Sequence, residues 1–394
     1  MLNPPRAFFS KVLLAVALAL PAASVGAGAP APAAPPASIA SLRLIGTARL
    51  PEGVKVDGTP VGGLSGLDYD AANDCWLAIS DDRSDRAPAR FYTLRLDYDG
   101  AQVGTFEVTA VTRLRQADGG LYPDRAHVDA QGGEVADPEA LRIDPRDGRV
   151  WYTSEGDDVR RTAPWVRRAD RSGAFAGELS LPAEFAFDPA DKSGVRPNAS
   201  FEGLSFTPGG EALWLGLEGP LVQDGPLPTL EHGAWARLTC VSRSGEVRRQ
   251  VAYPVESIYF PPAPGKLADN GISEVLAVSE HRLLVLERNG AQAADGSWHF
   301  GVRLYEADLT AATDVAGLPA LADAADLKPA RKRLLVDFRQ LFPDGVWNLE
   351  GLAWGRRLAN GHLTLLVVSD DNFDARQGTE CHVFEVIEQR ADAP

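Results

Sequence analysis

The 394-residue sequence has few of the residues that bind transition metals, with three cysteines and six histidines. Cys75, Cys240 and Cys381 lie far apart and form no Cys-x-x-Cys pair, which excludes a thiolate zinc cluster and a disulfide-dense scaffold. One long-range disulfide with one leftover thiol remains open, and the sequence does not select the pair. No His-Glu-x-x-His or His-x-His spacing occurs, so a catalytic zinc ion is not expected.

Positive charge is also scarce, because 39 Lys and Arg residues face 54 Asp and Glu residues, for a net charge of −15. Residues 1–38 contain two basic residues and no acidic one, so the rest of the chain carries −17. This balance excludes nucleic acid as a partner, since phosphate backbones need a basic footprint. It fits partners that are cations, or anions that are held through a cation.

Beyond the N-terminal region, no segment approaches 18 consecutive apolar residues. Near the N-terminus, Arg6 and Lys11 precede an apolar stretch at 12–20 and a Val-Gly-Ala sequence at 25–27. This order is typical of a secretory signal peptide, and the stretch is too short to span a bilayer. We therefore expect a periplasmic or secreted protein without a membrane anchor after signal cleavage; an uncleaved N-terminus is the alternative. The expected divisions are a signal peptide at 1–27, an Ala/Pro-rich disordered leader at 28–40 and one domain at 41–390.

A repeat organises the chain, because five segments share one short pattern around a leucine. The shared leucines are separated by 74, 63, 72 and 76 residues. Leu352 is followed by 42 residues and Leu67 is preceded by 26 from Ser41 onward, so an interval of 68 joins the two ends. A ring of similar units closes in this way, whereas an open solenoid needs distinct capping repeats. The segments are 64–69, 138–143, 201–206, 273–278 and 349–354.

Each unit is predicted to contain four short antiparallel strands, because apolar runs alternate with turn sequences and helical periodicity is almost absent. The last unit has only three such runs, and residues 42–50 near the N-terminus supply the fourth. The sharing of one sheet by both chain ends is how β-propellers close. The prediction is an all-β propeller of five four-stranded blades, and a sixth blade within loops 115–137 or 182–200 is the alternative.

Acidic residues recur at two positions of the units, the start of the first strand and the end of the second. Since neighbouring strands are antiparallel, both positions meet on one rim of the channel, where carboxylates need solvent, protons, cations or metal. Oxygen ligands without His or Cys favour calcium before magnesium or manganese. The alternative is that these side chains bond backbone groups between blades. The candidate metal ligands are Asp81, Asp82, Glu139, Glu155, Glu202, Glu218, Glu274, Glu287, Glu350, Asp370 and Asp371.

Cationic and amide side chains accompany these acids in the same predicted loops. Guanidinium groups beside bound cations are what an anionic substrate such as a phosphate ester requires, although surface ion pairs would explain each arginine taken alone. No Gly-x-Ser-x-Gly elbow occurs, so water activated by a metal, with Glu139 or Glu202 as base, is the more economical route to ester hydrolysis. The candidate substrate-binding residues are Arg83, Arg160, Arg196, Asn198, Arg288 and Asn372.

An ordered set of motifs resembles the phytase-like, or "esterase-like activity of phytase", family of exported bacterial proteins. The resemblance implies a periplasmic or secreted β-propeller with an ester or phosphoester hydrolase activity. The well-known propeller phytases have six blades and bind several calcium ions, whereas this chain has five units. The fourth unit also departs from the pattern, since Ser273-Glu274-Val275-Leu276 lacks the glycine. The motifs are 63–67 with 80–82, 137–141 with 154–155, 194–198 leading into 201–204, and 348–352 with 369–373.

The sequence thus favours an exported, calcium-binding propeller that hydrolyses an ester, with a phosphoester as the preferred class. The rival hypothesis is a non-catalytic periplasmic propeller that binds a ligand or a protein partner, in which the acids join the blades.

Overall fold

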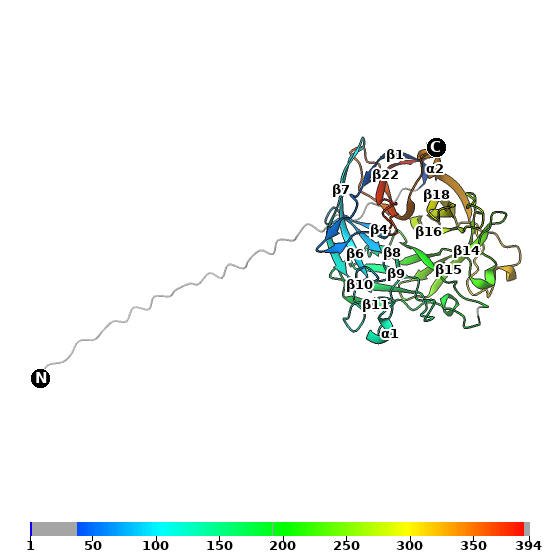
Figure 1. Cartoon of the computed structure of the whole chain (residues 1–394), viewed down its shortest axis with the longest axis horizontal. Helices are drawn as coiled ribbons and strands as arrows, with labels where there is room; N and C mark the ends of the chain where they lie inside the picture. Colours follow the sequence, from blue (N-terminus) through cyan, green and yellow to red (C-terminus); the bar gives the residue numbers. More distant parts are fainter. Residues whose placement is uncertain (2–37, 191, 390–394) are drawn as a thin grey trace.

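The computed structural model describes Met1 and residues 38–190 and 192–389, which form five antiparallel four-stranded sheets (Figure 1). The innermost strands of neighbouring sheets contact each other around a central axis, as in a β-propeller. The five-blade prediction is confirmed. Apart from Met1, the expected signal peptide lies outside the described residues.

The strands of each blade follow one another in sequence from the axis outward, except at the outer edge of the last blade. Blade 1 contains β4 (Leu64–Asp70), β5 (Cys75–Ser80), β6 (Arg90–Tyr98) and β7 (Val103–Arg113). Blade 2 contains β8 (Pro138–Ile143), β9 (Val150–Ser154), β10 (Trp165–Ala169) and β11 (Phe175–Glu178). Blade 3 contains β12 (Phe201–Phe206), β13 (Ala212–Leu217), β14 (Ala234–Ser242) and β15 (Val247–Val255). Blade 4 contains β16 (Ala268–Ser279), β17 (Arg282–Gln292), β18 (Trp298–Asp308) and β19 (Arg331–Asp337).

Both chain ends build blade 5, as the sequence predicted. It contains β20 (Asn348–Trp354), β21 (Thr364–Asp370), β22 (Glu380–Glu388) and, as outer strand, β1 (Ile39–Arg49). β1 pairs with β22 in antiparallel register from Ile39 opposite Glu388 to Arg49 opposite Glu380. These pairs close the ring with backbone hydrogen bonds between segments that are far apart in sequence.

Helices and short strands occur only in the connections of the described chain. The loops considered for a sixth blade, 115–137 and 182–200, hold one short helix or 3-10 turn and one isolated bridge each in their described residues. None of the described helices has the length and hydropathy needed to cross a membrane. The three cysteines are free thiols buried in three different blades, so no disulfide joins them. The connecting elements are β2 (Lys55–Val56), β3 (Thr59–Pro60), α1 (Val128–Gln131), α2 (Phe338–Leu341), η1 (Ala183–Phe185), η2 (Val222–Asp224) and η3 (Leu321–Asp323).

The hydrophobic core is divided between the blades, with one large cluster at each of the five blade interfaces. Trp76, Trp151 and Trp214 lie in the second strands of blades 1, 2 and 3 and are almost fully buried. Alternate residues of each strand face one of its two neighbouring blades, and burial of both faces explains why these strands are apolar almost throughout.

The glycine of the repeated pattern lies where neighbouring inner strands approach most closely. A Cβ atom added at Gly66 would lie 2.8 Å from the carbonyl oxygen of Glu139, and one at Gly203 would lie 2.8 Å from the amide nitrogen of Val275. Contacts below 3.0 Å force the backbone to move, so glycine at these positions sets how tightly the blades surround the axis.

We therefore expect Gly203→Ala to lower the free energy of unfolding by about 1–3 kcal/mol, because the added methyl group overpacks the contact between blades 3 and 4. Gly100→Ala is the matched control, since a Cβ atom there meets nothing within 4 Å. Urea unfolding of both variants measures the difference. Equal stability of the two variants would contradict this account of the motif.

Candidate metal and substrate site

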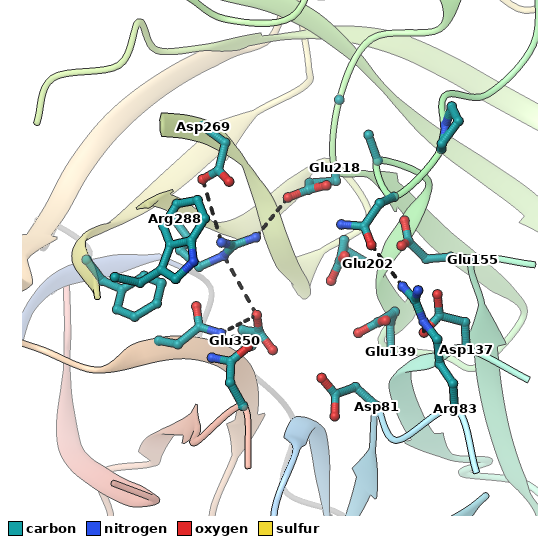
Figure 2. A pocket seen from close by; sticks show the side chains of 18 of the residues that line it. Asp81, Arg83, Asp137, Glu139, Glu155, Glu202, Glu218, Asp269, Arg288 and Glu350 are labelled. Carbon is teal, nitrogen blue, oxygen red and sulfur yellow. Dashed lines mark hydrogen bonds and ion pairs between the residues drawn. The ribbon is translucent and has the colours of Figure 1, made fainter. Parts of the chain in front are cut away.

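A cavity of about 810 Å³ opens at the end of the channel where the inner strands of blades 2, 3 and 5 begin (Figure 2). Ten carboxylic acids and four arginines line it, and no lysine or histidine of the described chain does. All five blades contribute at least one of the acids. The acids are Asp81, Asp82, Asp85, Asp137, Glu139, Glu155, Glu202, Glu218, Asp269 and Glu350, and the arginines are Arg83, Arg86, Arg125 and Arg288.

A β-bulge in the inner strand directs most of the motif residues into this cavity. In blades 1, 3 and 5 the register skips one residue, and the skipped residues are Ser65, Glu202 and Glu350. The irregular stretch of blade 2 contains Glu139. A bulge re-aims a side chain locally, and these four residues line the cavity or hydrogen-bond to a residue that does.

In blade 4 the bulge comes one residue earlier, at Ser273, so Glu274 keeps a regular ladder position. Its buried carboxylate lies 2.8 Å from the guanidinium of Arg142 and accepts hydrogen bonds from the backbone N–H groups of Leu204 and Val275. Glu274 was predicted as a metal ligand, but the structure places it outside the cavity. There it connects blades 2, 3 and 4, as the interblade alternative expected.

Glu287 also lies outside the cavity, because β17 continues past it instead of ending there. Its carboxylate accepts hydrogen bonds from the Tyr253 hydroxyl at 2.7 Å, the Lys332 ammonium at 2.6 Å and the backbone N–H of Glu256 at 3.0 Å. The next residue, Arg288, lines the cavity in its place. Blade 4 thus contributes a cation where the repeat predicted a carboxylate.

Three aspartates of the predicted set hold the rim loops in shape. Asp82 borders the cavity but forms a 2.8 Å ion pair with buried Arg90. Asp370 accepts a hydrogen bond from Asn348, and Asp371 accepts two from backbone N–H groups at 3.0 Å. Asp370 and Asp371 do not line the cavity. The predicted metal ligands that do are Asp81, Asp82, Glu139, Glu155, Glu202, Glu218 and Glu350.

Two groups of three buried acids bring their oxygens within 4.8 Å of one another. Asp137, Glu139 and Glu155 form the first group, and Glu155, Glu202 and Glu218 form the second. Glu155 belongs to both, so the two groups are adjacent. Carboxylate oxygens at such spacing match the ligands of a hard divalent cation, and the shared carboxylate would lie between two such ions.

Burial and mutual repulsion raise the pKa values of these acids. Burial raises the pKa of Glu139, Glu155 and Glu202 well above the usual range, and neighbouring carboxylates raise it further. Burial also raises the pKa of Asp137 to about 6 and that of Glu218 to about 7, although nearby arginines oppose the shift. Without a cation, the cavity therefore retains protons near neutral pH.

Two arginines project into the cavity from opposite sides (Figure 2). Arg83 forms a 2.6 Å ion pair with Asp137 and donates a hydrogen bond to Asn198. Arg288 donates a 2.9 Å hydrogen bond to Glu218 and lies 3.7 Å from Glu350. These contacts fix both guanidinium groups beside the acid groups, which is the arrangement that an anion bound near a metal requires.

The structure brings four of the six predicted substrate-binding residues to the cavity, namely Arg83, Asn198, Arg288 and Asn372. Arg160 instead pairs with Asp129 and Asp157, as the surface ion-pair alternative expected. Arg196 donates hydrogen bonds to two backbone carbonyl groups of the loop that follows β13. Both lie outside the wall of the cavity.

Sequence reasoning missed Asp137 and Asp269 as parts of the site. Asp137 lies two residues before Glu139, at the start of a quoted motif, so its position offered a usable signal. Asp269 had no signal, because the repeat did not show that β16 begins six residues before its shared Glu274-Val-Leu pattern. Ser65 occupies the motif position of blade 1 and donates a 2.7 Å hydrogen bond to Glu139.

A family model described as "Phytase-like: Esterase-like activity of phytase" matches residues 59–373. The chain belongs to the phytase-like family. The match contains all five inner strands and every residue that lines the cavity, so this phytase-like chain is a propeller of the hydrolase type. The resemblance predicted from the motifs is confirmed. No curated protein matches the chain.

Solved structures resemble this phytase-like propeller only distantly. The catalytic domain of a Coprinopsis cinerea GH62 α-L-arabinofuranosidase has 12% identity and a TM-score of 0.38, over 89% of this chain and 98% of that one. A thermostable family-43 glycoside hydrolase has 10% identity and a TM-score of 0.40, over 85% and 94%. A Penicillium chrysogenum α-L-arabinanase bound to arabinobiose has 11% identity and a TM-score of 0.38, over 84% and 80%. Similarity at this level carries no conclusion about the substrate.

The raised pKa values predict that the metal-free phytase-like propeller loses stability as the pH rises. The native state binds more protons than the unfolded chain, from 3.8 to about 6 for Asp137 and from 4.5 to about 7 for Glu218, so the free energy of unfolding falls through these windows. Chemical unfolding of dialysed protein should give a lower value at pH 8 than at pH 5, and Glu218→Gln should reduce the decrease. A metal-free protein that gains stability over this range would contradict the prediction.

The two classes of glutamate are expected to respond oppositely to removal of their charge. Glu274→Gln should destabilise the metal-free protein by about 3 kcal/mol at pH 8, because buried Arg142 loses its ionic partner. Glu202→Gln should stabilise it, because one of several repelling carboxylates is removed. Urea unfolding of both variants tests this difference, and equal losses of stability would show that Glu202 also joins blades.

Proposed function

We propose that the protein is an exported hydrolase of phosphate esters that uses divalent cations, calcium before magnesium or manganese, at the acid groups of the cavity. The observation that carries the proposal is the pair of acid groups sharing Glu155, with two arginines fixed in the same cavity. Family membership supports hydrolase chemistry. Export rests on the N-terminal sequence pattern, which lies outside the described residues.

The residues present fit divalent cations. The donors are carboxylate oxygens alone, which suit calcium better than zinc or copper. Their raised pKa values show that the cavity lacks compensating positive charge, which a bound cation would supply. Asp137, Glu139 and Glu155 would hold one cation, and Glu155, Glu202 and Glu218 a second. When bound, such cations polarise a phosphoryl oxygen and lower the pKa of bound water.

The chain's own groups would orient the reactants. Ser65 donates a hydrogen bond to one carboxylate oxygen of Glu139 and fixes its orientation. No described residue donates a hydrogen bond to Glu202, whose pKa is raised by burial and by neighbouring charges alone. Glu202 is therefore the better of the two predicted bases, because its oxygens are free to accept a proton from the attacking water. Arg83 and Arg288 would donate N–H groups to the phosphoryl oxygens.

The first test is phosphate release from phenyl phosphate by the purified protein with and without a chelator. We expect chelation to abolish release and calcium to restore it. Glu202→Gln should lower kcat by about 10²–10⁴-fold, because the base is lost while calcium-dependent folding persists. Glu52→Gln is the matched control, since the Glu52 side chain is 75% exposed.

Two results would contradict the proposal. Release that survives both chelation and Glu202→Gln would exclude the metal-dependent mechanism. If the calcium-loaded protein cleaves neither phosphate nor carboxylate esters, the non-catalytic, ligand-binding alternative would be favoured.

A further inference from the structure

Blade 4 forms an aromatic wall on the side of the cavity opposite the acid groups. Its strands β17 and β18 pair as far as Gln292 opposite Trp298, beyond the position at which the second strands of the other blades end. Phe300 lies opposite Gly290 in the same ladder, and both aromatic side chains line the cavity. Since alternate residues share a face, Trp298, Phe300 and Arg288 lie on one face of blade 4.

Glycine 290 gives the indole of Trp298 its place on this wall. A Cβ atom at Gly290 would lie 3.0 Å from Cζ3 of Trp298 and 2.8 Å from a carboxylate oxygen of Asp269. The indole therefore packs against the backbone of β17 while its side chain remains partly exposed. Leu227, which is 47% exposed, extends the apolar lining from blade 3. An exposed aromatic and leucine inside a cavity mark a surface for an apolar part of a ligand.

The cavity has little positive charge for a highly phosphorylated ligand. Of the four lining arginines, Arg83, Arg125 and Arg288 are already ion-paired with carboxylates. Ten acids line the same cavity, so two divalent cations, with four positive charges, would still leave acids in excess. One phosphoryl group can be bound beside such cations, whereas many on one molecule would repel the remaining carboxylates.

We propose that the substrate carries a single phosphoryl group on an uncharged, ring-bearing alcohol, and that the ring packs on Trp298 while the phosphoryl group faces Arg288 and the acid groups. Arg288 lies between the wall and Glu218, which places both halves of the ligand within one cavity. This inference rests on the proposed function and adds to it the class of the alcohol. A flat apolar ring face matches the indole, as in aromatic and sugar rings bound by proteins.

Binding of two non-hydrolysable probes to the calcium-loaded protein tests the inference. Phenylphosphonate carries a ring and methylphosphonate does not, while both carry the same anionic group. We expect wild-type protein to bind phenylphosphonate about 10-fold more tightly than methylphosphonate in calorimetry. Trp298→Ala should remove this preference and leave the affinity for methylphosphonate within about 2-fold, which also shows that the variant is folded.

Two further variants control for the aromatic side chain. Trp298→Phe should retain most of the preference, because it keeps a planar ring. Trp235→Ala removes a tryptophan that is 38% exposed and does not line the cavity, so both affinities should stay as in wild type.

Equal affinities for the two probes, or a preference that survives Trp298→Ala, would overturn the inference. Tighter binding of myo-inositol hexakisphosphate than of phenylphosphonate would also overturn it. The outcome for hydrolysis is separate. A ring preference without turnover of any ester would support the wall and overturn the hydrolase proposal, whereas turnover without a ring preference would do the reverse.

Discussion

Repulsion among carboxylates buried at one end of the channel controls the chemistry of this propeller. Burial and neighbouring charges raise the pKa of Glu139, Glu155 and Glu202 together, so none of them ionises easily unless positive charge enters the cavity. The fold opposes this repulsion with five apolar blade interfaces and with the backbone ladder between β1 and β22 that closes the ring. Acids that would separate on a flexible loop are thereby held within a few ångströms of one another.

The repeated acidic residues serve two purposes that the sequence pattern does not distinguish. Glu202 and Glu350 lie at bulged positions and line the cavity, whereas Glu274 occupies the same place in the pattern and binds Arg142 and two backbone N–H groups. The difference between them is a bulge moved by one residue. Both expectations for the acids, as ligands of a cation and as links between blades, therefore describe different members of one set.

The architecture could be predicted because it depends on features that recur. Five leucine-centred segments gave the blade number, and the missing strand of the last unit gave the ring closure at residues 42–50. The site was less predictable in blade 4, where the longer β16 and β17 change which residues reach the cavity. Nothing in the pattern Ser273-Glu274-Val275 shows where a bulge falls, since bulge position depends on pairing with the next strand and on the close contact of Val275 with Gly203. The missing glycine was the only sign that this blade would differ.

The central claim is that the two acid groups hold divalent cations through Glu155, and calcium titration by calorimetry tests it most directly. Metal-free wild-type protein should bind two calcium ions per chain with release of protons, because the retained protons must leave the carboxylates. Glu155→Gln should weaken both binding events, whereas Glu274→Gln should retain the stoichiometry of two, since Glu274 lies outside the cavity. Absence of calcium binding to the wild-type protein, or an unchanged titration of Glu155→Gln, would contradict the account.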